Sequence, residues 1–238
     1  MSDVLLIHGS SHGAWCWTHV IPALQALGHG ARAIDLPAHG QDQTPAALAS
    51  LDGYASAILN AIDRPVILVG HSMAGFPITL AAQMAPEKIS ALVYLCAYLP
   101  KPGLSLAQMR RAGPSQPLAS AIRPADDRIT FSFDPALAVE AFYHDCGADD
   151  RALAACLLCP EPIAPQETAI PDTARAEALP RFYIRCTEDR AIPPDYQATM
   201  ARDLPAHRIS ALRSSHSPFF AMPGALAQRL HQIATSPL

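Results

Sequence analysis

Short runs of apolar residues alternate with longer segments of mixed character along most of the chain. The runs that favour strands are 4–8, 31–36, 65–71, 90–98, 181–187 and, more weakly, 207–212. The early runs are apolar at successive positions, which is typical of parallel strands that are covered on both faces. The segments that favour helices are 18–28, 45–62, 74–86 and 224–235. This alternation predicts βαβ units and a doubly wound α/β fold.

The rhythm breaks in residues 99–179, a Pro-rich stretch that contains a helical segment at 135–158. The FSF triplet at 131–133 is compatible with a short strand or a loop. We predict one core formed by residues 1–98 and 180–238, with residues 99–179 inserted as a cap. Ligands of open α/β sheets bind at the carboxyl ends of strands, where this insertion emerges. The alternative is a helical decoration without a role in binding.

Length and composition restrict the class of protein. A chain of 238 residues can form one sizeable core with an insertion, and its 50% hydrophobic and 16% charged residues favour a globular protein. The net charge of -4, with no basic cluster longer than Arg110-Arg111, gives no reason to expect a nucleic-acid partner. No apolar run approaches the roughly 20 residues of a membrane span. The first residues, MSDVLLIHG, lack the positive charge of a signal peptide, so we expect a cytoplasmic protein.

The six cysteines, scattered through apolar segments, favour reduced thiols over a disulfide framework. Cys156 and Cys159 have the CxxC spacing of redox and zinc sites. No second CxxC or histidine pair accompanies them, and their surroundings, ALAACLLC, are typical of an apolar helix face. Structural thiols are the preferred interpretation.

The segment PVILVGHSMAGF at 65–76 predicts a nucleophile. A buried strand runs into Gly-His-Ser, and a helix-like run follows. A nucleophile elbow needs small residues two positions before and after the nucleophile, so that strand and helix can pack closely. Gly70 and Ala74 hold these positions around Ser72, although Ala74 departs from the usual glycine. The alternative is a strand that ends at an ordinary polar turn.

Two further residues complete a predicted triad, because a serine hydroxyl needs a base, and the base needs an acid to orient it. Asp189 follows the strand run 181–187, and His216 follows the run 207–212. The order Ser, Asp, His is the order of this class of fold. Glu188 is the local competitor for the acid. Each residue alone could be a turn or helix cap, but three in the correct order at three strand ends favour catalysis.

The tetrahedral intermediate of acyl transfer needs backbone donors for its oxyanion. One predicted donor is the N–H of Met73, which follows the nucleophile. The other is the N–H of Ser10, in the loop after the first strand, where Gly9 permits a tight backbone path.

Together, the segments HGSSHGAWCW, DLPAHG, GHSMAG, YIRCTEDRAIP and SSHSPF resemble the α/β-hydrolase group of plant methylesterases, hydroxynitrile lyases and bacterial esterase relatives. The similarity extends over essentially the whole chain, and HGAWCW and FYHDCGADDRALA are its more specific signals. The resemblance implies an α/β-hydrolase fold with a compact sheet of about six strands, helices on both faces and a helical cap. It also implies the roles given above for Ser72, Asp189, His216, Ser10 and Met73.

The resemblance leaves three activities to weigh. Lyases of this group have a threonine after the first histidine and a lysine after the catalytic one. Here Gly9 and Ser217 hold these positions, which favours a carboxylesterase. A small-molecule receptor of the same fold is a further alternative, but the intact triad disfavours it.

The expected substrate is a small, largely apolar ester, including methyl or aryl esters, and the mechanism needs no metal or organic cofactor. The sequence does not determine the leaving group or distinguish a monomer from a homodimer. The candidate pocket residues are Gly9, His12, Trp15, Phe131, Phe142, Leu158 and Phe219, of which His12 and Trp15 could instead only pack beneath the pocket.

Overall fold

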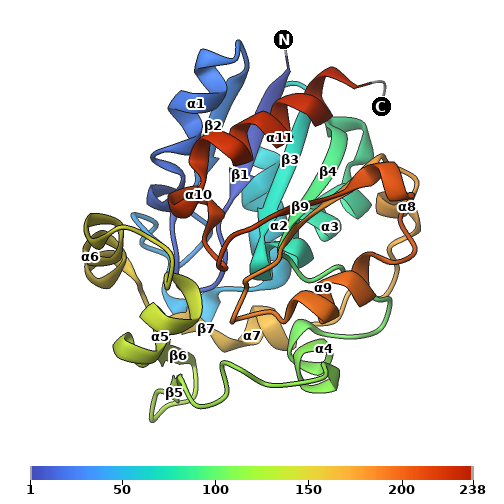
Figure 1. The fold of residues 1–238 in the computed structure, drawn as a ribbon. Helices are drawn as coiled ribbons and strands as arrows, with labels where there is room; N and C mark the ends of the chain where they lie inside the picture. The colour runs from blue at the N-terminus through green and yellow to red at the C-terminus, as the bar shows by residue number, and fades with distance from the viewer. Residues whose placement is uncertain (1, 237–238) are drawn as a thin grey trace.

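The computed structural model describes residues 2–236 and has a central parallel sheet (Figure 1). Its strands are β1 (Asp3–Ile7), β2 (Gly30–Ile34), β3 (Val66–His71), β4 (Ile89–Leu95), β8 (Arg181–Cys186) and β9 (Ile209–Leu212). They lie in the order β2-β1-β3-β4-β8-β9, and every neighbouring pair is parallel. The predicted α/β fold with about six strands is confirmed.

Helices cover both faces of this sheet because its strands are apolar on both sides. In β1, Leu5 and Ile7 pack into one layer, while Val4 and Leu6 pack into the other. The helices that contribute to the first layer are α2 (Leu51–Asn60), α3 (Gly75–Met84) and α9 (Pro194–Ala201). Those of the second layer are α1 (Val20–Ala26), α10 (Pro218–Ala221) and α11 (Pro223–Thr235). Successive strand residues therefore face opposite layers.

Short elements account for the main differences from the predicted helices. The segment 45–62 was expected to be one helix, but it forms a 3-10 turn and then α2. The reason is Ser50, whose hydroxyl accepts a 3.0 Å hydrogen bond from the Gly53 N–H and starts α2 at Leu51. The 3-10 turns are Ala14–Trp17, Ala46–Leu48, Ser72–Ala74, Pro86–Lys88 and Ala206–Arg208.

The insertion, residues 99–179, is mixed rather than purely helical. Its elements are α4 (Leu106–Ala112), β5 (Ile122–Pro124), β6 (Thr130–Phe133), α5 (Pro135–Phe142), α6 (Ala148–Leu157), β7 (Glu161–Pro162), α7 (Ile163–Glu167) and α8 (Ala174–Glu177). β5, β6 and β7 form a small antiparallel sheet. Of the two alternatives for FSF at 131–133, the short strand is correct, but β5 and β7 were not predicted because they are so short. In Figure 1 these elements, apart from α8, lie beyond the carboxyl ends of the central strands. Helix α8 instead packs against α3 of the core.

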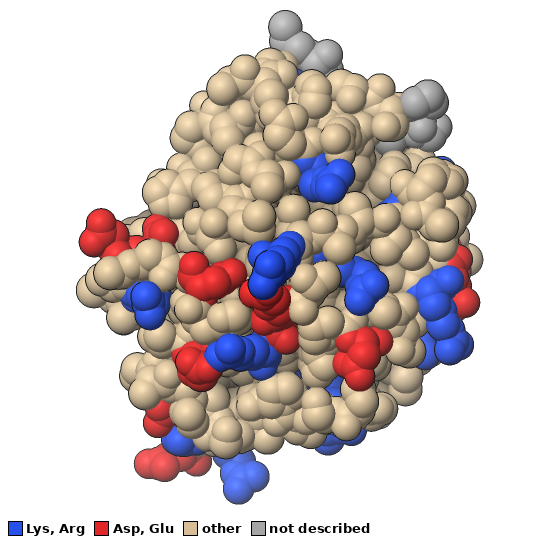
Figure 2. Space-filling view, in the orientation of Figure 1, with Lys and Arg blue, Asp and Glu red and all other residues tan. Residues whose placement is uncertain are grey.

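Neither the charges on the face seen in Figure 2 nor the cysteines indicate a further functional site. Figure 2 shows acidic and basic side chains interspersed on the face in view, without a broad area of one sign. Within residues 2–236, no helix is both long and apolar enough to span a membrane. All six cysteines are described, and each is a free thiol.

Candidate active site

The candidate catalytic residues come from the carboxyl ends of four strands. Ser10 follows β1, Ser72 follows β3, Asp189 follows β8 and His216 follows β9. The ends of parallel strands lie along one edge of the sheet. The chain thus delivers residues that are more than 200 positions apart in sequence to a single edge.

Ser72 lies in a strained turn between β3 and α3. Its φ of 56° is in the left-handed region, which is costly for a residue other than glycine. The close packing predicted around it is present: a Cβ at Gly70 would lie 2.8 Å from the carbonyl oxygen of Ala74. A larger residue at position 70 would push the strand away from the turn. This geometry presents the Ser72 side chain at the apex of the turn.

Asp189 and His216 form a buried pair. His216 Nδ1 lies 2.7 Å from Asp189 Oδ2, and both residues are almost fully buried. Asp189 Oδ1 accepts hydrogen bonds from the N–H groups of Ala191 and Ile192, at 2.7 and 2.9 Å. A carboxylate held on both oxygens has a fixed direction, so it also fixes the ring of His216 and the tautomer with a proton on Nδ1.

Gln197 on α9 supports this carboxylate and was not identified in the sequence. Its amide nitrogen donates to Asp189 Oδ2 and to the carbonyl oxygen of Ile192, each at 2.8 Å. Its amide oxygen accepts a 2.9 Å hydrogen bond from the Cys186 N–H at the end of β8. Gln197 is fully buried, and all of these bonds hold the acid loop in place.

His71, the residue before Ser72, connects two loops of the site. Its Nε2–H donates a 2.8 Å hydrogen bond to the backbone carbonyl of His216. Burial lowers the pKa of His71 well below its ordinary value, so the ring is neutral. His71 therefore ties the turn that carries Ser72 to the loop that carries His216.

Ser72 and His216 open into the same cavity. Its lining is mostly apolar and comes from both the core and the insertion. The lining residues are Ser10, His12, His71, Ser72, Met73, Tyr98, Leu106, Arg110, Leu118, Phe131, Phe133, Phe142, Gln166, Ile192 and His216.

The two residues whose N–H groups are predicted to bind the oxyanion lie beside the cavity. Ser10 and Met73 both line the cavity. Within the described residues 2–236, neither backbone N–H is engaged in a hydrogen bond outside helices and strands. Gly9 allows the loop to approach the turn: a Cβ there would lie 2.7 Å from His71 Nδ1 and 2.9 Å from Ser72 Cβ.

Residues of the insertion form hydrogen bonds with the loop that carries Ser10 and Ser11. Glu161 of β7 accepts a 2.6 Å hydrogen bond from the Ser11 N–H, and Gln166 of α7 donates to the Ser10 hydroxyl at 2.8 Å. The N–H of Cys159 donates to the Ser11 carbonyl at 2.9 Å. Ser11 has a φ of 61°, so these bonds hold a strained residue next to Ser10.

Glu161 is fully buried and is paired with His39 of the core, at 2.9 Å. Burial alone would lower the pKa of His39, but the neighbouring carboxylate outweighs it and raises that pKa. The other ring nitrogen of His39 lies 3.0 Å from the Pro37 carbonyl oxygen, so both ring nitrogens face acceptors. This arrangement suits a charged imidazolium at His39.

We expect Glu161→Gln to lower kcat about tenfold with little change in KM. The loss of one buried charge-assisted hydrogen bond, on the order of 1.5–3 kcal/mol, loosens the loop that carries the Ser10 N–H. Steady-state kinetics and a thermal melt would check this. Glu140→Gln is the matched control, because Glu140 also joins the insertion to the core, through Arg190, but at the surface. An unchanged kcat in folded Glu161→Gln would contradict the prediction.

His12 lies in the cavity wall rather than only beneath it. Its Nδ1–H donates to the Ser10 carbonyl at 2.7 Å, and its Nε2 accepts from the Tyr143 hydroxyl of the insertion. Burial lowers the pKa of His12 to about 4, so it is neutral near pH 7. Phe131 and Phe142 also line the cavity.

The other candidate pocket residues lie elsewhere, which corrects the expectation for them. Gly9 packs under the Ser72 turn, and Phe219 is completely buried against Trp17 and His71. Trp15 stacks on the far side of His12, outside the cavity wall. Leu158 lines a different cavity, between the insertion and Ser11.

Several residues of the site were missed because their sequence signals are weak. Glu161, Gln166 and Arg110 lie in the insertion, where a single polar residue in irregular sequence has no diagnostic spacing. The DLPAHG motif contains His39, but nothing in it indicates which acid pairs with that ring. Only the fold brings residues 39 and 161 together.

Comparisons with known proteins show the family and the kind of relatives that this chain has. The sequence model of a protein family, described as "Alpha/beta hydrolase family", matches residues 4–229. Methylesterase 18 of Arabidopsis thaliana is 32% identical over 255 residues, covering 98% of this chain and 97% of that protein. Methyl jasmonate esterase 1 of Vitis vinifera is 29% identical, covering 98% and 96%. The crystal structure of a pyrethroid hydrolase from Sphingobium faniae superposes with a TM-score of 0.88 at 28% identity, covering 99% of this chain and 98% of that one.

Proposed function

The chain belongs to the alpha/beta hydrolase family and is a carboxylic ester hydrolase, and on this premise we propose that Ser72, His216 and Asp189 form its catalytic triad. The single observation that carries the proposal is the buried 2.7 Å pair of His216 and Asp189, which opens into the same cavity as Ser72. Within residues 2–236, no other charged side chain forms a hydrogen bond or an ion pair with His216 Nδ1.

The reaction follows from the arrangement. His216 Nε2 removes the proton of the Ser72 hydroxyl as its oxygen attacks the ester carbonyl carbon. The carbonyl oxygen becomes an oxyanion, which the N–H groups of Ser10 and Met73 stabilise. The protonated His216 then gives its proton to the departing alcohol, which leaves the acyl group on Ser72. Water attacks the acyl-enzyme in a second, equivalent cycle, and the free acid is released.

Asp189 orients His216 and stabilises the imidazolium without taking its proton. Gln197 and the N–H groups of Ala191 and Ile192 keep Asp189 in place. The esterase chemistry needs no metal or organic cofactor at any of these steps.

The cavity supports a small, largely apolar ester as substrate. Phe131, Phe133, Phe142 and Leu118 form apolar walls around the site. Two of the relatives are named as esterases, a methylesterase and a methyl jasmonate esterase, and the third is named as a hydrolase of pyrethroids. Small methyl or aryl esters with an apolar acyl part fit these walls best.

A lyase has less support. Ser217, fully buried, stands where the lyases of this group carry a lysine, so no cation adjoins His216 there to stabilise a cyanide leaving group. Gly9 occupies the position of their threonine and packs beneath Ser72.

A series of p-nitrophenyl esters from acetate to octanoate, together with matching methyl esters, tests the substrate class. We expect turnover of the short members and a fall in kcat/KM once the acyl chain exceeds the cavity. A cyanohydrin panel is the control for lyase activity. Cyanohydrin cleavage without ester hydrolysis would contradict the proposal.

A further inference from the structure

One positive charge stands in the wall of the catalytic cavity and has no anionic partner. Among the lining residues, Arg110 is the only one with a permanent charge, and none is Asp or Glu. The pKa values of His12 and His71 are lowered, mainly by burial, so these rings add no charge near pH 7. Arg110 is therefore the one permanent charge in a cavity wall that is otherwise largely apolar.

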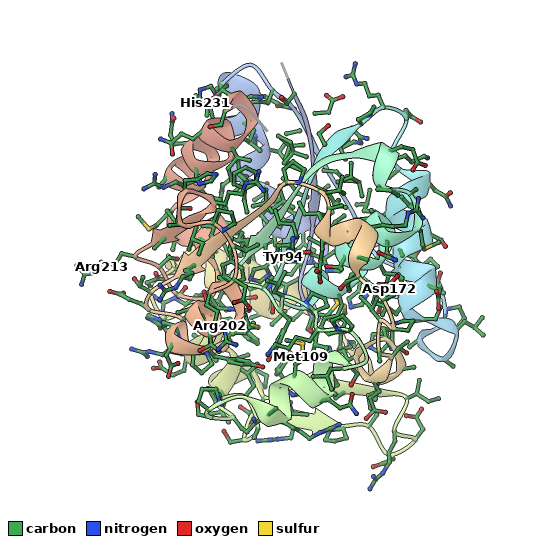
Figure 3. All side chains as sticks on the ribbon, turned by 90° about the vertical axis from the view of Figure 1, so that its right-hand side faces the viewer. Tyr94, Met109, Asp172, Arg202, Arg213 and His231 are labelled. Atoms are coloured by element: carbon green, nitrogen blue, oxygen red, sulfur yellow. The ribbon has the colours of Figure 1, made fainter. Side chains whose placement is uncertain are left out.

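Arg110 lies in the last turn of α4, next to two residues with different roles. Met109, labelled in Figure 3, is buried in the core layer on the side of α4 that faces the sheet. Arg111 is exposed to solvent. Arg110 is partly buried, and its side chain lines the cavity that also contains Ser72. A cation at a helix carboxyl end has a favourable interaction with the helix dipole, but exposed Arg111 supplies that equally well.

The Arg110 guanidinium has no partner within the protein. Within residues 2–236, no carboxylate lies within 4.0 Å of it, and it donates no hydrogen bond to a protein atom. Six other arginines do pair with carboxylates: Arg64, Arg123, Arg175, Arg190, Arg202 and Arg213. A partly buried guanidinium with its donors free is suited to a ligand that brings the acceptors.

Arg110 lies where the catalytic cavity adjoins a second cavity. Arg110, Tyr98 and Leu118 line both the catalytic cavity and a second, neighbouring cavity. The second cavity also contains Arg111, Ser115 and Gln116, so it is the more polar of the two. A group bound to Arg110 would thus lie at the boundary between the two cavities.

We propose that Arg110 binds a free carboxylate of the substrate, so that the preferred substrates are half-esters of dicarboxylic acids with an apolar chain between the two ends. The proposal rests on the esterase function proposed above. The ester end lies at Ser72, the chain lies along Phe131 and Phe142, and the carboxylate forms a charge-assisted, bidentate pair with the guanidinium.

Paired substrates that differ only in charge test this binding mode. Monomethyl esters of dicarboxylic acids, from succinate to suberate, are compared with neutral methyl esters of the same length. We expect wild type to prefer the anionic member, with an optimum chain length that reports the span between Ser72 and Arg110.

Arg110→Gln is expected to raise KM for the anionic ester by about 10–100-fold, a far larger change than for the neutral ester of the same length. Arg111→Gln removes the same charge from the neighbouring, solvent-exposed position and should change neither. Arg110→Lys should restore binding in part, because an ammonium keeps the charge but not the planar fork.

Binding to the catalytically dead protein separates this proposal from the esterase proposal. By calorimetry, Ser72→Ala should bind the monomethyl dicarboxylate, and Ser72→Ala with Arg110→Gln should not, whether or not the wild type turns the ester over. Three results would overturn the proposal: equal kcat/KM of wild type for charged and neutral esters, an equal loss in Arg111→Gln, or unchanged binding in the double variant. Neutral-ester hydrolysis that survives Ser72→Ala would overturn only the triad.

Discussion

Ser72→Ala is expected to lower kcat for every hydrolysed ester by about 10⁴–10⁶-fold, because the acyl-enzyme can no longer form. The substitution removes one oxygen. Alanine and serine have a similar cost at the positive φ of residue 72, so the protein should still fold. KM, or the dissociation constant of a bound ester, should change little. Steady-state hydrolysis by the two purified proteins, with a thermal melt of each, measures the effect.

The residual rate of Ser72→Ala has a clear physical source. The N–H groups of Ser10 and Met73 and the cavity itself would remain, and such features alone sustain roughly 10³–10⁴-fold catalysis over water in a comparable triad enzyme. Activity within about tenfold of wild type in folded Ser72→Ala would show that another group is the nucleophile. Ser10→Ala is the control for that case, since Ser10 is the other serine in the cavity wall.

Asp189→Asn has the second-largest expected effect, a fall in kcat of about 10⁴-fold, by analogy with the same change in a serine protease triad. An amide at position 189 can present its NH₂ to His216 Nδ1, which favours the wrong tautomer and withdraws the proton acceptor from Ser72. The bonds from Ala191 and Ile192 can persist to the amide oxygen, so stability should fall less than activity. Kinetics and a melting curve distinguish the two effects.

Glu188→Gln is the matched control for Asp189→Asn. Glu188 is the neighbouring acid, but its carboxylate turns outward and pairs with exposed Arg213 at 2.6 Å. We expect Glu188→Gln to keep nearly wild-type kcat. A large loss in Glu188→Gln together with a small one in Asp189→Asn would reassign the acid.

The sequence was most informative about the buried strands and about the catalytic candidates that directly follow them. The β3 run and its small neighbours indicate a strained serine turn, and the structure has Ser72 at a φ of 56° there. Apolar residues at successive positions predicted strands buried on both faces, and the two packed layers follow from that pattern. These features depend on residues that are close in sequence or on the general geometry of parallel sheets.

The supporting residues could not be predicted, because their partners are set by tertiary contacts. Gln197 is an ordinary helix residue until α9 places it against Asp189. Glu161 is an acid in a Pro-rich stretch until β7 pairs with β6 and brings it to Ser11 and His39. The strands of the small sheet are too short for a periodic pattern to emerge.

The pocket was only partly predictable for a related reason. An aromatic residue near a catalytic loop can face the cavity, as Phe142 does, or pack behind it, as Phe219 does. The side chain's direction depends on the tilt of short helices that carry little periodic signal. Arg110 shows the same limit, since a pair of arginines at a helix end does not reveal which one turns inward.

The most direct test of the central claim is labelling with a p-nitrophenyl phosphonate followed by peptide mass spectrometry. The phosphonate resembles the tetrahedral intermediate and is trapped only by an activated serine. We expect one equivalent of label, located on Ser72 in the peptide that contains GHSMAG, and we expect its loss in Ser72→Ala and strong slowing in Asp189→Asn. Label on another residue, or no label on a protein that hydrolyses esters, would contradict the assignment of Ser72 as the nucleophile.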